Sequence, residues 1–206
     1  MSESYEIHIR NPVTATINLD GFYVSAKTDA GRHVAIHEAG LVAFVATTAE
    51  YNTDTRYHDI ATGQTAPRPT NIRPILPANP NAAAVSQFNI LISDYQATVM
   101  SLKQLSDKIY HGLSPATQSV MDEFANNNPG FYQRPWAMFD FIYTRHGTIT
   151  AEHIDNAKKT LRMPFDSSVN TLESHNVSLN KMFTFLARAS QVVNEYDKMQ
   201  YYEIVA

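Results

Sequence analysis

Cysteine is absent from this 206-residue chain, which excludes disulfide bonds, zinc knuckles and thiol chemistry. Glycine is scarce, and none of the seven glycines has the spacing of a phosphate-binding loop. Long apolar runs are also missing, because no stretch approaches the roughly 20 apolar residues of a membrane span. The N-terminus lacks the basic and apolar regions of a signal peptide. We therefore expect no membrane partner and a location in the cytoplasm.

Charged side chains are few, at 17% of the chain compared with roughly 25% in typical soluble domains. Residues 1–85 carry 6 basic and 8 acidic side chains and residues 86–206 carry 10 and 12, so the net charge of −4 is evenly spread. Nucleic-acid binders usually show a basic patch or tail. Nucleic acid is therefore possible as a partner but weakly favoured by charge. A low charge is typical of a chain that buries surface against partners.

The first 61 residues show a pattern typical of β-structure. Asp20-Gly21 lies between two runs with high β-propensity, which is a common hairpin signal. The apolar run at 41–48 has the length of a strand, although its pattern does not distinguish a strand from a buried helix. Further strands are expected at 15–19, 22–26 and 32–37. We predict a β-rich N-terminal portion over residues 1–61.

Proline is concentrated in one window, since five of the ten prolines lie within residues 62–81. This density is incompatible with a regular helix and favours an extended segment. We predict a proline-rich linker or arm over residues 62–84. An arm of this length can reach a neighbouring subunit.

From residue 85 onward the apolar residues recur at spacings of three and four, which predicts a helix with one apolar face. Its face consists of Val85, Phe88, Ile92, Tyr95, Val99, Leu102, Leu105 and Ile109. Gly112 is expected to stop this helix, and Ser114-Pro115 to begin the next. Further boundaries are expected at Arg134-Pro135, Gly147, Thr150 and Pro164, with Asp166 or Ser168 capping the last long helix. The fold class is thus predicted as α+β, with about six helices in a C-terminal domain over residues 85–206.

Few residues suggest chemistry. His33 and His37 have the four-residue spacing of a helical metal pair, but their segment resembles a strand, so we interpret them as a satisfied or exposed pair. His146 and His153 are interpreted as helix-terminal residues. No serine lies in a Gly-x-Ser-x-Gly turn. We expect no catalytic, metal or cofactor site, no small-molecule substrate and no enzymatic activity.

Aromatic residues crowd one short region, with six of them between Phe131 and Tyr143. One helix cannot bury so many rings on one face, and aromatic residues are enriched at interfaces. Together with the prolines of the arm they predict an assembly interface. Its expected members are Phe131, Tyr132, Trp136, Phe141, Pro69, Pro74 and Pro77.

The region after these aromatics resembles a known family. A helix closes with Tyr143-Thr-Arg-His-Gly-Thr-Ile-Thr150, and Met163-Pro-Phe-Asp166 precedes a long helix that carries Met182-Phe183. This order resembles the Gag-like capsid region of copia- and gypsy-type retrotransposon polyproteins, over about residues 95–205. The chain departs from the family by lacking its Cys/His knuckle and by one extra residue between Tyr and Gly. The resemblance implies a helical capsid-type domain that associates with itself.

These observations together predict a structural, self-assembling protein that forms homo-oligomers of many copies in a capsid-like shell or filament. Its expected location is then the cytoplasm or a virus-like particle. The alternative is an adaptor, domesticated from a Gag protein, that binds host proteins through its helical domain. An enzyme is a third possibility without a supporting motif.

Overall fold

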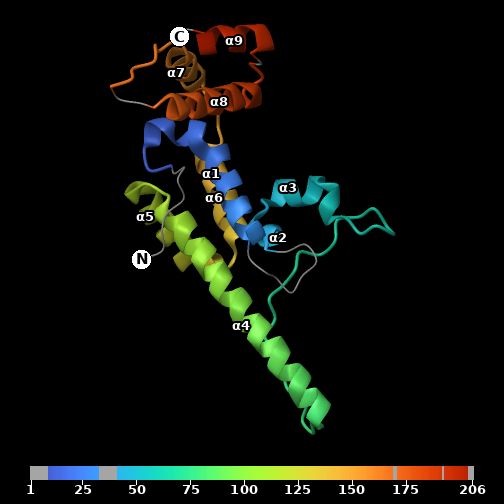
Figure 1. The fold of residues 1–206 in the computed structure, drawn as a ribbon. Helices are drawn as coiled ribbons and strands as arrows, with labels where there is room; N and C mark the ends of the chain where they lie inside the picture. Colours follow the sequence, from blue (N-terminus) through green and yellow to red (C-terminus); the bar gives the residue numbers. More distant parts are fainter. Residues whose placement is uncertain (1–8, 33–40, 169–170, 192, 204–206) are drawn as a thin grey trace.

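The computed structural model describes residues 9–32, 41–168, 171–191 and 193–203, and this part of the chain folds into helices without a β-sheet (Figure 1). In chain order the helices are α1 (Pro12–Arg32), α2 (Val42–Val45), α3 (Thr48–Thr53), α4 (Ala82–His111), α5 (Pro115–Asn126), α6 (Pro135–His146), α7 (Ala151–Leu161), α8 (Leu172–Arg188) and α9 (Glu195–Glu203). Two 3-10 turns also occur, η1 (Thr55–Tyr57) and η2 (Phe131–Gln133). In Figure 1, α1 and α6 occupy the centre, α7–α9 lie at one end, and α4 extends away from the other.

The α+β prediction is wrong, because no β-strand lies in the described part of residues 1–61 and α1 occupies most of the region where strands were expected. Small and apolar residues recur in α1 at spacings of three and four, and all are buried: Ala15, Leu19, Phe22, Ala26 and Ala30. That spacing forms one stripe on a helix. The alternation at 15–19 is compatible with either structure, and burial of the stripe favours the helix. Most of the strand expected at 32–37, with His33 and His37, lies outside the described residues.

Asp20 lies in the middle of α1 rather than in a hairpin turn, and it joins three helices. Its carboxylate accepts a hydrogen bond from Arg188 Nη1 of α8 at 2.7 Å and one from the Tyr143 hydroxyl of α6 at 3.2 Å. Arg188 Nη2 also donates to the Thr16 carbonyl at 3.0 Å. Burial, with the nearby Asp20 charge, raises the pKa of Tyr143. The dipeptide that suggested a turn therefore supplies the anion that fixes α8 to α1.

Residues 41–48, for which the pattern left strand and helix open, contain α2 and the start of α3. Thr47 caps α3, since its side chain accepts a hydrogen bond from the Glu50 N–H at 3.2 Å. The Glu50 carboxylate accepts one hydrogen bond from the Tyr23 hydroxyl and another from Lys27 Nζ, the latter at 3.0 Å. Burial, followed by the hydrogen bond to Glu50, raises the pKa of Tyr23. These contacts hold α3 against α1.

Two apolar cores meet at α1. The larger core unites α1 and α2 with the C-terminal half of α4, with α5 and with α6, so residues on both sides of the proline-rich segment contribute to it. The smaller core contains Ile17 of α1 and buried residues of α7 and α8. Because α1 contributes side chains to both cores, it is buried on more than one face.

The helix boundaries expected after residue 85 are largely confirmed. Ser114 caps α5 with Pro115 at its first position, and Pro135 begins α6. Thr150 caps α7 in a capping box in which the His153 ring, in place of a carboxylate, accepts the Thr150 N–H at 3.2 Å. The expected cap of the last long helix is wrong, because Thr171 caps α8. The described residues from 82 onward contain six α-helices.

His146 gives a prediction for the effect of pH on stability. It ends α6, its Nε2 lies 3.2 Å from Thr117 Oγ1 of α5, and burial together with the charge of Arg145 lowers its pKa. Because the pKa of His146 is lower in the folded state than its ordinary value near 6.5, the unfolded chain binds the proton more tightly. His146 therefore has no effect on the free energy of unfolding well above pH 6.5, and it lowers this free energy as the pH falls below 6.5. We expect the free energy of unfolding to fall less steeply below pH 6.5 in His146→Gln than in the wild type. Urea denaturation at pH 7.5 and at pH 5.5 measures the free energy of unfolding of each protein. An equal change between the two pH values in both proteins would contradict the prediction.

Candidate functional site

The N-terminal half of α4 projects from the body of the molecule (Figure 1). We call residues 82–101 the outer half of α4. Asp94 is the single charged residue in it. Several of its apolar side chains are exposed, with Ile90 at 61% and Met100 at 63%, together with Val85, Leu91 and Val99. The outer half is thus an apolar, nearly uncharged helix that the rest of the described chain leaves largely uncovered.

The segment 67–80 leads from the body to the start of α4 without regular secondary structure, in keeping with its prolines. Its apolar side chains are exposed as well, with Ile72 at 75% and Ile75 at 88%. Pro74 is half-buried and Pro77 is exposed. The segment and the outer half of α4 thus present two neighbouring apolar surfaces to solvent.

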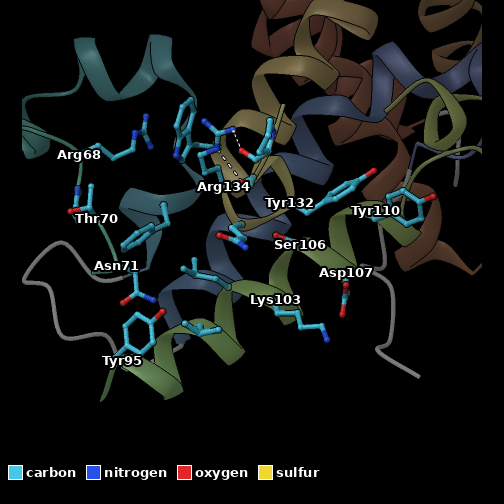
Figure 2. Close-up of a pocket in the computed structure, with 18 of the residues that line it drawn as sticks. Arg68, Thr70, Asn71, Tyr95, Lys103, Ser106, Asp107, Tyr110, Tyr132 and Arg134 are labelled. Carbon is cyan, nitrogen blue, oxygen red and sulfur yellow. Dashed lines mark hydrogen bonds between the residues drawn. The ribbon is translucent and has the colours of Figure 1, made fainter. Parts of the chain in front are cut away.

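A cavity of about 880 Å³ lies where this segment leaves the body (Figure 2). Three parts of the chain form its walls: residues 68–71, the stretch of α4 between Tyr95 and Tyr110, and residues 129–136 around η2. Phe44 and Asp122 complete the lining. The cavity is therefore built from segments that are far apart in the sequence.

Arg68 fixes the first wall. Its Nη1 donates to the carbonyls of Ala43 and Ala46 at 2.6 and 2.8 Å, so the guanidinium satisfies backbone acceptors at the end of α2. The same group lies over the rings of Tyr51 and Trp136, at 4.1 and 4.8 Å from their centroids. Burial lowers the pKa of Arg68, and the two aromatic faces help to accommodate its charge. The proline-rich segment is consequently held to the body at its first residues.

The opposite wall contains a carboxylate shared by two tyrosines. Asp122 of α5 accepts hydrogen bonds from the hydroxyls of Tyr132 and of Tyr110, the latter at 2.8 Å. Burial, followed by the hydrogen bond to Asp122, raises the pKa of both phenols. Gly130 allows the turn before η2 with a positive φ of 74°, and the Arg134 side chain donates to its carbonyl at 3.2 Å. This wall is fixed by hydrogen bonds within the chain.

Two polar groups of the α4 wall have no partner among the described residues. The Ser106 hydroxyl is buried, with the residue 4% exposed, and no hydrogen-bond partner for it lies among the described residues. Half-buried Asp107, one residue further along, makes neither an ion pair nor a hydrogen bond through its carboxylate within the described part of the chain. A buried polar group without a partner is destabilising by roughly 1–3 kcal/mol. Both residues line the cavity (Figure 2), so a bound group there could satisfy them.

The residues predicted as an assembly interface do not all lie together. Tyr132, Trp136 and Pro69 line the cavity. Phe131 is 2% exposed and belongs to the larger core, so it is not a surface side chain in this fold. Phe141 is half-buried beside Phe131, with ring centroids 6.2 Å apart. Pro74 and Pro77 lie outside the cavity lining, on the same proline-rich segment as Pro69.

Sequence patterns alone missed Arg68, Ser106 and Asp107. Arg68 lies between two prolines, which is consistent with a fixed backbone but gives no sign of the carbonyls that its side chain reaches. Ser106 and Asp107 lie within the long α4, where a serine and an aspartate are ordinary solvent-facing residues. Only the packing of the segment 68–71 against α4 gives these residues a shared site.

The described residues contain no group of three or more His, Cys, Asp or Glu side chains that could hold a metal ion. Within the same residues, no helix is both long and apolar enough to cross a membrane. Comparison with protein-family models, with curated proteins and with solved structures finds no match to this chain. The functional interpretation therefore depends on the geometry described above.

Proposed function

We propose that this protein is a structural subunit that assembles with copies of itself, in a shell or filament of the Gag-like capsid type that its sequence resembles. The outer half of α4 carries this proposal. The apolar stripe of α4 continues over about six turns, and its burial decreases toward the N-terminus of the helix. Leu105 and Ile109 are completely buried, whereas Phe88, Ile92 and Tyr95 are half-buried and Val85 and Val99 are 37% and 41% exposed.

Packing against another surface would stabilise a helix of this kind. The outer half is about 30 Å long. Most of the stability of a helix in a protein comes from the packing of its apolar face. Its residues include β-branched Val85, Ile90 and Ile92, which are weaker helix formers than alanine. Packing against another molecule would bury the stripe and stabilise the projecting turns.

A second copy is the cover that the charge pattern favours. The surface has almost no charge, so two copies meet without repulsion apart from their Asp94 side chains. An uncharged apolar stripe is complementary to itself, which suits a two-fold contact between two copies of one chain. If this helix recognised its partner through charge, it would carry more charged residues.

Two glutamates placed on the stripe should disrupt this association. Because each charge would be buried without a partner, we expect Val85→Glu with Ile92→Glu to weaken self-association by about 100-fold or more. Multi-angle light scattering after size-exclusion chromatography over a concentration series measures the mass. The matched control is Ser86→Glu with Ser93→Glu, which adds the same charge to exposed positions away from the stripe. Equal masses for the two double variants, at concentrations where the wild type associates, would contradict the proposal.

A further inference from the structure

We propose that the cavity binds residues 73–77 of the proline-rich segment of a second copy of this chain. The inference rests on the proposed self-association and assigns it a site and a ligand. The ligand is an extended peptide that carries a Pro-x-x-P motif with an arginine before it. The receptor is the aromatic cavity between residues 68–71, α4 and η2.

The ligand segment has a restricted backbone. Its sequence is Arg73-Pro74-Ile75-Leu76-Pro77. Proline fixes φ at about −65°, and a residue before proline is biased to extended or polyproline conformations, so four of the five positions are restricted. The segment consequently loses little entropy on binding, which is why Pro-x-x-P motifs are common ligands. Arg73, Ile75 and Pro77 are all exposed and available to another molecule.

The cavity has the side chains that suit such a ligand. Aromatic-lined grooves are the general receptors of Pro-x-x-P peptides, because flat rings pack on the proline rings. Aromatic side chains line this cavity on several sides, from α4 and from the region of η2: Tyr95, Tyr110, Tyr132 and Trp136. Asp122 accepts hydrogen bonds from Tyr110 and Tyr132, and the Arg68 guanidinium lies over the Trp136 ring, so three of these four rings are fixed by contacts within the chain.

The unpartnered polar groups match the ligand. Arg73 makes no ion pair or side-chain hydrogen bond within the described part of its own chain, and Asp107 lies in the cavity wall with an equally unpartnered carboxylate. Of the other charged residues in the lining, Arg68, Arg134 and Asp122 bond within the chain, which leaves Lys103 and Asp107. Arg73 and Asp107 are opposite in charge. The buried Ser106 hydroxyl can bond to a peptide group of the extended ligand, which satisfies its missing hydrogen bond.

In this structure the cavity lining contains no residue of the chain's own Pro-x-x-P motif. Within one chain, residues 68–71 already form a wall of the cavity, and the side chain of Arg68 holds that wall to α2. Immediately after this wall Ile72 and Ile75 are 75% and 88% exposed, so the chain's own Pro-x-x-P motif lies outside the cavity. A neighbouring copy presents the same exposed motif on a segment fixed next to its own cavity. Two copies can therefore each place their proline-rich segment in the cavity of the other.

A charge exchange tests the pairing of Arg73 with Asp107. We expect Arg73→Asp and Asp107→Arg each to weaken self-association by about tenfold to a hundredfold, because each places two like charges together. The chain with both substitutions restores opposite charges and should recover most of the lost association. The readout is the dissociation constant from sedimentation of the full chain. Both positions carry solvent-accessible side chains, so the fold tolerates the changes, and circular dichroism verifies it. If the loss of self-association in the double variant equals the sum of the losses in the two single variants, Arg73 does not pair with Asp107.

A peptide experiment separates this inference from the proposed function. The probe is a fluorescent peptide of residues 71–81, added to the full-length chain with Val85→Glu and Ile92→Glu, which leaves the cavity lining intact. We expect saturable binding in fluorescence anisotropy, and at least tenfold weaker binding when Pro74 and Pro77 of the peptide are replaced by alanine. Equal binding of the two peptides, or none, would overturn the cavity site even if the wild type assembles. Specific binding by a wild type that stays monomeric would uphold the cavity as a site for Pro-x-x-P peptides, but would contradict both the proposed function and a second copy as the source of the ligand.

Discussion

Replacing Gly112 by alanine should lower the free energy of unfolding by about 1–3 kcal/mol or more. A Cβ at this position would lie 2.4 Å from Cε2 and 2.6 Å from Cζ of Phe22, far inside contact distance. The Phe22 ring is completely buried and packs against Phe139, with centroids 5.8 Å apart, so it has no space into which to move. Gly112 has a φ of −77°, which alanine adopts readily, so the effect is steric. Urea denaturation followed by circular dichroism measures it.

Gly31→Ala is the matched control for this prediction. Gly31 lies in α1, and the nearest atom to its added Cβ is Val42 Cγ2 at 3.7 Å, an ordinary contact. Alanine also has a helix propensity about 1 kcal/mol better than glycine, so this variant should be neutral or more stable. If Gly112→Ala were as stable as Gly31→Ala, the close packing of α1 against the end of α4 would be incorrect.

Replacing Arg188 by alanine should destabilise the fold by about 2–3 kcal/mol. Its guanidinium bonds Asp20 at 2.7 Å and the Thr16 carbonyl at 3.0 Å, and its loss leaves the Asp20 carboxylate without its cation. The Arg188 and Asp20 side chains are about a quarter exposed, at 24% and 25%, so water compensates part of the loss. The substitution therefore weakens the junction between α8 and α1. Thermal and urea unfolding measure the effect.

A double-mutant cycle separates the pair from its surroundings. Asp20→Ala and Arg188→Ala, made singly and together, should show a coupling free energy of about 1–2 kcal/mol. The control is Arg56→Ala, which removes a cation paired with Asp54 on the surface, where the arginine side chain is 68% exposed. Its effect on stability should be small, because solvent screens exposed pairs. Additive losses at Asp20 and Arg188 would show that the pair does not join α1 and α8.

The helices after residue 85 could be predicted because local chemistry marks their ends. Ser114 with Pro115, and Thr150, occupy cap positions whose side chains bond the first free N–H groups. Such signals depend on neighbours within four residues and need no knowledge of the fold. The prediction of Asp166 or Ser168 as a cap missed Thr171 because aspartate and serine are the stronger cap residues in isolation, and the type of residue alone does not show where the helix begins.

The N-terminal prediction was wrong for a physical reason that one segment makes clear. Asp20-Gly21 is a common hairpin turn, and glycine within a helix is unfavourable by about 1 kcal/mol. The buried stripe that includes Leu19 and Phe22, and the bond from Asp20 to Arg188 far away in sequence, outweigh this local cost. A pattern within ten residues contains no information about Arg188.

The candidate site could be predicted only in part. The aromatic surplus pointed to Tyr132 and Trp136, and the prolines to Pro69, all of which line the cavity. The same reasoning included Phe131, which the core buries, because composition does not reveal which ring faces inward. Ser106 and Asp107 become significant only through the contact of α4 with the proline-rich segment. That contact is a property of the tertiary structure.

Sedimentation velocity of the full-length wild-type chain over a wide concentration range tests self-assembly most directly. The monomer has a mass of 23.1 kDa. The exposed stripe of the outer half of α4 predicts species of two or more copies whose fraction rises with concentration. A single species of 23.1 kDa at every concentration, up to the highest at which the protein remains in solution, would contradict the proposed function.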